Sequence, residues 1–326
     1  MFDGPGEKET PHPDQLGGET GKRGEREGLR ARLRRQDTAK SHTLALVSAI
    51  GSVNAQAIGL RYQRILECGD WLKYRDYFTG PGIKLHSANF CMNTLVCSLC
   101  AIRRASRNMA AYLERFQVVQ AACPELRPYL VTLTVRNGPD LGERLKKLTD
   151  SLKLLHHRRV ETKSKSLMRE VAGGVYSIEV TNTGKEWHPH VHAIWLAEEA
   201  PNMYALRGEW EQITGDSFIC DVRPIVALTD VPADIDPHAG GFAEVFKYAL
   251  KPSELGPAMM VAAYPVLKGK RLLASFGVFR GVQVPESLAD DLTGLEDLPY
   301  FELLFRHTRT GYKLQVPAVP MEGSSS

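Results

Sequence analysis

The spacing of apolar positions predicts helices in the first part of the chain and a β-rich core after it. From Thr43 to about Leu66, Ala, Leu, Ile and Val recur at the spacing of one or two helices, interrupted near Gly51. A β-branched run at 129–135 predicts a strand that ends at turn-forming residues. Other patterns predict helices at about 103–119, 141–168, 203–214 and 242–251, strands at 175–181, 218–226 and 300–305, and a helix end at 271–277.

The stretch from Glu186 to Trp195 predicts a strand with two different faces. Alternate side chains of a strand share a face, so His188, His190 and His192 lie together, opposite the face that carries Trp187. Neutral imidazole is the commonest transition-metal ligand. Three of the ten histidines fall within five positions, which favours a metal site over a surface strand that is merely rich in histidine.

A turn at 182–185 connects the 175–181 strand to the histidine strand, so the two form a hairpin. If the turn is centred between Gly184 and Lys185, Glu179 pairs opposite His190 and lies on the histidine face. Glu179 is therefore a candidate third metal ligand, beside His188, and the alternative is an exposed strand carboxylate. The predicted fold is α+β, a central antiparallel sheet of four to five strands with helices on one face, preceded by a helical, cysteine-rich segment.

Four of the six cysteines lie close together in the sequence. Cys97-x-x-Cys100 has a zinc-knuckle spacing, and Cys91 and Cys68 complete a four-thiolate set, with His86 as a substitute ligand. Buried free thiols or a redox pair are the alternatives. The helix after them carries Arg103, Arg104 and Arg107, a candidate phosphate-contacting face.

The amino-acid composition is typical of a soluble globular protein and indicates little about the function. The 326 residues are 43% hydrophobic and 24% charged, with a net charge of +3. No apolar run approaches the ~20 residues that span a bilayer, and the start lacks a signal-peptide pattern. We therefore expect a cytoplasmic protein without membrane contact. Residues 1–40 have almost nothing to bury and predict a disordered charged tail, whose arginines either stay solvated or contact phosphate.

Glu244 and Tyr248 are four residues apart and share a face of the 242–251 helix, as Lys247 and Lys251 roughly do. From spacing alone, the tyrosine is half-buried packing.

In their order along the chain, these stretches resemble the replication initiators of rolling-circle plasmids, in the HUH endonuclease superfamily. The resemblance covers about residues 65–280. The matching stretches are Leu85–Cys91 with Cys97-x-x-Cys100 and the arginines after it, Leu130–Val135, His188–His192 and Glu244–Lys251.

The resemblance implies an HUH-like fold and a metal-dependent, site-specific single-strand endonuclease and strand transferase. Its metal ligands are His190 and His192. Mixed histidine and glutamate ligands and phosphate chemistry suit Mg²⁺ or Mn²⁺, and isolated imidazoles would also accept zinc. Tyr248 attacks the DNA, forms a 5′-phosphotyrosine link and leaves a 3′-OH that primes replication. Glu244 activates a water, or positions the second strand, in the terminating step, and Lys247 and Lys251 contact DNA beside the arginines.

The expected partners are a single-stranded or hairpin origin and the host helicase and polymerase. The expected domains are the tail (1–40), a cysteine-rich zinc- and DNA-binding region (41–128), the nicking domain (129–285) and a C-terminal extension (286–326). One alternative function is a non-cleaving, zinc-containing origin-binding protein. Another is a hydrolase that uses the histidines with a water nucleophile.

Overall fold

The computed structural model describes residues 21–79, 82–161, 165–182, 184, 186–229, 236–246, 255–315 and 320–321. By its internal contacts the chain forms two compact units. The larger unit comprises Ala39–Gly69 and Asn89–Ala289, and the smaller unit comprises Met1–Thr38, Asp70–Ala88 and Asp290–Ser326. Within the described residues, no helix combines the length and apolar character needed to cross a membrane.

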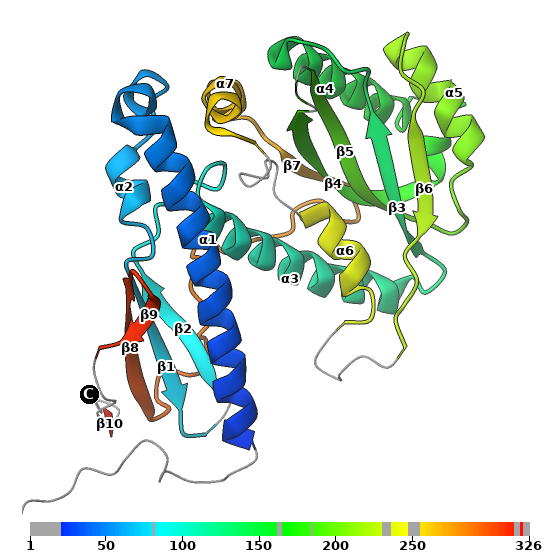
Figure 1. Ribbon diagram of the computed structural model, residues 1–326. Helices are drawn as coiled ribbons and strands as arrows, with labels where there is room; N and C mark the ends of the chain where they lie inside the picture. The colour runs from blue at the N-terminus through cyan, green and yellow to red at the C-terminus, as the bar shows by residue number, and fades with distance from the viewer. Residues whose placement is uncertain are drawn as a thin grey trace, which may run out of the picture. The chain divides into compact units, whose positions relative to one another are not determined.

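A five-stranded antiparallel sheet forms the centre of the larger unit (Figure 1). Its strand order is β6-β3-β5-β4-β7. This confirms the predicted α+β fold and its central sheet. The strands are β3 (Arg127–Thr134), β4 (Val171–Asn182), β5 (Trp187–Ala197), β6 (Cys220–Pro224) and β7 (Leu273–Gly277).

Helices cover both faces of this sheet, whereas one face was predicted. On one face, α4 (Leu141–Arg158) and α5 (Met203–Thr214) share a hydrophobic core with Val191 and Trp195. On the other face, α3 (Ser98–Ala122) and α6 (Ala239–Phe246) share a second core with Ile194 and Leu196. The reason lies in β5 itself: past His192, its histidine face becomes apolar and requires a helical cover.

The larger unit contains several further helices. Helix α1 (Gly21–Ala57) belongs to this unit from Ala39 onward, and it contains Gly51 at φ 74°, so its regular path is interrupted where the sequence predicted. Next come α2 (Tyr62–Leu66) and, later in the chain, the 3₁₀ helix η2 (Leu167–Glu170) and α7 (Pro257–Leu267).

The smaller unit contains a second antiparallel sheet, which packs on the first part of α1. Its strand order is β10-β8-β1-β2, with β9 also paired to β8. Only β8 was predicted. The strands are β1 (Trp71–Tyr77), β2 (Ile83–Ala88), β8 (Tyr300–Thr308), β9 (Gly311–Leu314) and β10 (Pro320–Met321).

Three sequence predictions differ from the structure. The tail expected to be disordered to residue 40 is helical from Gly21, because a sparse stripe including Leu29 and Gln36 is buried. Helix α4 ends at Arg158, not 168, since its apolar stripe stops at Leu155. The predicted helix end at 271–277 is instead edge strand β7. Residues 1–20 lie outside the described part of the chain.

Candidate active site and metal centres

The β4–β5 hairpin brings a carboxylate onto the histidine face. Glu179 pairs directly opposite His190, and Ser177 opposite His192, as the predicted turn register requires. Gly184, in the connection between the strands, has φ 98°, and its N–H donates to Asn182 Oδ1 over 2.8 Å. The hairpin therefore fixes which side chains share the face.

Glu179, His190 and His192 form one cluster of metal-ligating atoms. Glu179 Oε2 lies 3.6 Å from His190 Nε2 and 3.4 Å from His192 Nε2. The side chains are 6%, 11% and 20% exposed, respectively, so the carboxylate is the most deeply placed. Burial of a carboxylate is offset by hydrogen bonds and by nearby positive charge, and a metal ion at this cluster would supply such a charge.

The hydrogen bonds of His190 fit a metal ion at this cluster. Its Nδ1–H donates to the carbonyl of His188 over 3.2 Å. In the neutral ring, Nε2 then carries a lone pair and faces the oxygen of Glu179, which is also an acceptor. Two acceptors face each other favourably when a cation lies between them. The Nδ1 atom of His192 lies 3.3 Å from Thr132 Oγ1, the kind of outer contact that orients a ligating imidazole.

His188 contributes no atom to this cluster of ligand atoms, although its ring contacts His190. Its Nδ1–H donates to Asn137 Oδ1 over 2.6 Å, and its ring stacks on His190 with centroids 4.9 Å apart. Burial lowers the pKa of His188, and the neighbouring His190 lowers it further. Of the two predicted candidates for the third ligand, Glu179 and not His188 has an atom grouped with the ligand atoms of His190 and His192.

The predicted cysteine set converges in the larger unit. Cys68, Cys91, Cys97 and Cys100 are all buried and free of disulfides. The Cys68–Cys100 and Cys68–Cys97 sulfurs are 3.5 Å apart, and the Cys91–Cys100 sulfurs 3.6 Å. Zn–S bonds of about 2.3 Å at tetrahedral angles place sulfurs about 3.8 Å apart. The four sulfurs therefore fit a tetrahedral metal ion, whereas His86 belongs to the smaller unit and not to this group.

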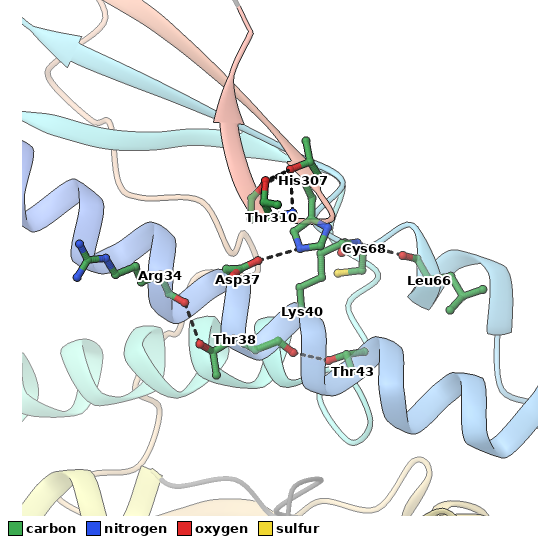
Figure 2. A network of polar contacts seen from close by, with 12 residues as sticks. Arg34, Asp37, Thr38, Lys40, Thr43, Leu66, Cys68, His307 and Thr310 are labelled. Carbon is green, nitrogen blue, oxygen red and sulfur yellow. Dashed lines mark hydrogen bonds and ion pairs between the residues drawn. The ribbon is translucent and has the colours of Figure 1, made fainter.

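The surroundings of the cysteines also suit an anionic metal site. The Cys91 N–H donates to Cys68 Sγ over 3.3 Å. Figure 2 shows the buried Lys40 ammonium, which donates to the carbonyls of Leu66 and Cys68 over 3.1 and 2.8 Å. Hydrogen bonds from the other cysteines lower the pKa of Cys97, whereas hydrogen bonds and burial raise the pKa of Cys100. A metal cation would stabilise the thiolate form of all four side chains.

Helix α6 lies over the same sheet face as the histidines. Its Phe242, Val245 and Phe246 are buried in the core that also contains Val175 and Ile194. Glu244, on the same helix, is half-buried. Tyr248, Lys247 and Lys251 fall outside the described residues, so their roles stay predictions. The helix thus brings the chain, two residues before Tyr248, onto the histidine side of the sheet.

Comparisons with known proteins match the same stretch of chain. The family model for "Replication protein" (Rep_1) matches residues 82–301, more than half of the chain. The chain belongs to this family. It is 28% identical to "Protein rep" of Bacillus amyloliquefaciens over 74% of this chain and 70% of the relative. It is 26% identical to "Protein rep" of Lactiplantibacillus plantarum over 57% of this chain and 60% of that relative. No solved structure matches it.

Membership of the replication protein family confirms the resemblance to rolling-circle plasmid replication initiators. The Rep_1 match includes Glu179, both clustered histidines and three of the four cysteines. Cys68 precedes it, yet lies in the same cluster.

In this Rep family member, the predicted DNA-contacting arginines have structural partners. Arg103 Nε donates to the Leu288 carbonyl, and Arg104 donates to the carbonyls of Pro285 and Glu286, each over 2.7 Å. The Nε of Arg107 is buried without a hydrogen-bond partner. Two of the three arginines thus fasten the 285–288 segment to α3, and DNA contact by the set stays a prediction.

A cavity of about 470 Å³ lies between α3, the end of α6 and the histidine face. Its lining includes Arg104, Ser177, Phe246 and Lys270. Ser177 pairs opposite His192, so the cavity reaches a strand position next to the candidate metal ligands. Sequence reasoning did not select Ser177, Thr132 or Asn137, because their importance depends on strand register.

Proposed function

We propose that this chain initiates plasmid replication by nicking one DNA strand at the origin, with Tyr248 as the nucleophile. The observation that carries the proposal is the meeting of three features on one sheet face. These are the Glu179–His190–His192 cluster, helix α6 leading toward Tyr248, and a cavity lined by Phe246 of α6 and by Ser177, which pairs opposite His192. The substrate is a single-stranded or hairpin origin.

Glu179, His190 and His192 would hold a divalent metal ion, Mg²⁺ or Mn²⁺. A bound ion supplies Lewis-acid polarisation of the scissile phosphate. The protein contributes rigidity, because both histidines and the carboxylate stand on paired strands. Thr132 and the His188 carbonyl orient the two imidazoles.

Tyr248 Oη attacks the scissile phosphorus as it loses its proton. The bond from phosphorus to the 3′ oxygen breaks, and that oxygen takes up a proton. The products are a 5′-phosphotyrosine link and a free 3′-OH that primes synthesis. The phosphodiester to the protein preserves the bond energy for later strand closure.

Glu244 serves the terminating step. Its carboxylate accepts a proton from water as that water attacks the phosphotyrosine, which releases Tyr248 and a 5′-phosphate. The cysteine cluster would hold a structural zinc ion that orders the segment before α3. Host helicase and polymerase are the partners that extend the primed strand.

The decisive experiment is a denaturing gel of the full chain incubated with single-stranded origin DNA and Mn²⁺. We expect a DNA-linked protein band with the wild type and none with Tyr248→Phe, which keeps the ring but removes the nucleophilic oxygen. Tyr204→Phe, an exposed tyrosine on α5, is the matched control and should behave as wild type.

The same gel separates the alternatives. Origin binding without cleavage would identify a non-cleaving, zinc-containing origin-binding protein. Cleavage that survives Tyr248→Phe would identify hydrolysis by water at the histidine site. Either outcome would overturn the proposal.

A further inference from the structure

The sheet of the smaller unit has one face turned toward α1 and one turned away from it. Tyr74 Oη donates to Gln36 of α1 over 2.7 Å, and the Arg32 guanidinium lies 5.6 Å from the Tyr74 ring centroid. Since side chains alternate along a strand, Trp71, Lys73, Arg75 and Tyr77 of β1 lie on the opposite side. We call this side, with its cross-strand neighbours, the outer face.

The outer face is strongly basic. Arg75 pairs with Lys84 of β2 and with Glu302 of β8, and Trp71 pairs with Arg306, which pairs with Lys313 of β9. Arg306 and Lys313 are exposed. Among the described strand positions of this face, Glu302 is the one acidic residue, and it forms a salt bridge with Lys73 over 3.0 Å. The basic residues of the face are Lys73, Arg75, Lys84, Arg306 and Lys313.

Polar atoms without partners gather on the same face. In the described part of the chain, four buried side-chain nitrogen or oxygen atoms lack a hydrogen bond, and three of them are Arg75 Nε, Tyr77 Oη and His86 Nδ1. His86 lies between the residues that pair with Lys73 and Tyr74, where the register of β1 and β2 shifts. Burial lowers its pKa, and the charges of Arg75 and Lys73 lower the pKa further. Such groups normally find partners, so their concentration here points to a polar ligand.

Aromatic rings lie between the basic residues. The Arg75 guanidinium lies 4.2 Å from the Tyr300 ring centroid, and Tyr77 and Tyr300 contact edge to face at 5.6 Å. Trp71 is half-buried, whereas the other three tryptophans, Trp187, Trp195 and Trp210, are buried. Interleaved cationic and aromatic side chains on a sheet are the features that bind single-stranded nucleic acid through phosphates and stacked bases.

We propose that the outer face binds single-stranded DNA, with Lys84, Arg306 and Lys313 contacting phosphates and Trp71 stacking on a base. The choice of DNA rests on the proposed function, in which nicking releases a single strand. The site lies wholly within the smaller unit, so it is separate from the histidine cluster, the candidate nicking site.

The test measures binding of the full chain to fluorescein-labelled oligothymidylate, about 30 nucleotides long, and to a duplex of equal length. Arg306→Gln with Lys313→Gln removes two exposed charges. The control variant, Lys146→Gln with Lys153→Gln on α4 of the larger unit, removes the same charge from side chains that are 79% and 77% exposed. For the Arg306/Lys313 variant only, we expect about tenfold weaker single-strand binding near 0.15 M salt. The slope of the logarithm of its binding constant against the logarithm of the salt concentration should be smaller in magnitude by about 1.4. Thermal melts check that both variants fold.

Trp71 provides a direct readout. Oligothymidylate should quench tryptophan fluorescence in the wild type, and Trp71→Phe should abolish the quenching. The inference is overturned if the Arg306/Lys313 variant binds as the control does, if duplex binding falls as much as single-strand binding, or if quenching survives Trp71→Phe. A nicking assay on short origin strands separates the two proposals. If the wild type does not nick, the proposed function with Tyr248 as the nucleophile fails. The outer-face proposal is then still tested, because binding of oligothymidylate does not require nicking.

Discussion

Glu179 carries the negative charge that distinguishes the candidate active site from a cluster of imidazoles alone. We predict that Glu179→Gln lowers the affinity for Mn²⁺ by at least roughly 10- to 100-fold, the loss typical for outer-shell partners of a metal ligand. The amide keeps the size of the side chain but removes its charge. Calorimetric titration with Mn²⁺ measures the change, and Glu186→Gln, an exposed carboxylate beside β5, is the control. Equal affinity in both variants would exclude Glu179 as a ligand.

His156 of α4 makes stability depend on pH. Its ring lies between Tyr176 and Phe276, with centroids at 5.3 and 4.5 Å, and burial, then Arg159, lowers its pKa to about 4. Because the folded pKa lies below the unfolded value of about 6.5, the unfolded chain binds more protons between these values. Stability from neutral His156 is therefore complete above pH 6.5 and falls as the pH drops toward 4, by up to about 3 kcal/mol.

Denaturant melts at pH 7 and pH 5 measure this effect. His156→Phe should lose less stability on acidification than the wild type. The neighbouring His157→Phe, at an exposed position, should lose as much as the wild type. An unchanged pH dependence in His156→Phe would show that other groups govern acid sensitivity.

At the residue scale, the sequence predicted Glu179 as a candidate metal ligand, because the position of the hairpin turn determines which residue of the preceding strand pairs with His190. Asn137 and Thr132 could not be found in the same way. Thr132 stands 60 residues before the His192 ring that it contacts. Its role follows from the pairing of β3 with β5, which no local pattern reveals.

Among the elements, α6 carries Glu244 and ends two residues before Tyr248, and the roles proposed for these two side chains can be separated by experiment. We predict that Glu244→Gln leaves the first cleavage intact, because the proposed nucleophile is Tyr248. The hydrolytic step should slow by about 10²–10⁴-fold, since a general base is lost. Covalent adduct should then accumulate on a denaturing gel over time, on a substrate that the wild type turns over. If the first cleavage fails as completely as with Tyr248→Phe, Glu244 instead serves the nucleophile or a metal.

Long periodic elements were predictable, and short ones were not. Helix α5 (Met203–Thr214) has the bounds that its pattern predicted. Five-residue strand β7, with the sequence Leu-Ala-Ser-Phe-Gly, fits a helix end equally well, because a short apolar run carries no period. Its pairing with β4, a hundred residues earlier, decides its structure.

At the scale of the whole molecule, the smaller unit was the least predictable part. Its β1 pairs with β8, so that Tyr74 lies opposite Leu303. Nothing in the 71–77 segment indicates a partner more than two hundred residues away. The four cysteines, by contrast, lie close enough in sequence for their spacing to predict their convergence.

That convergence gives a prediction for the molecule as a whole. Removing metal with a chelator, or Cys100→Ser, should remove bound zinc and unfold the segment around the cysteines, because a structural metal contributes folding free energy. Nicking of short single strands should survive, since the histidine cluster stands on strands β4 and β5, outside the cysteine segment, and Mn²⁺ can be restored. Zinc content and limited proteolysis measure the change. Cys220→Ser, outside the cluster, is the control, and equal zinc content in both variants would exclude the site.

The pairing of Glu179 with His190 also limits how this gene can change. If the connection kept its present length, inserting or deleting one codon between Asn182 and Trp187 would shift one strand by a residue relative to the other. Every side chain of that strand would then turn to the opposite side of the sheet. Glu179 would enter the hydrophobic core, and Ile178 would face the imidazoles. We therefore expect length variation in this connection among functional relatives to occur in steps of two residues.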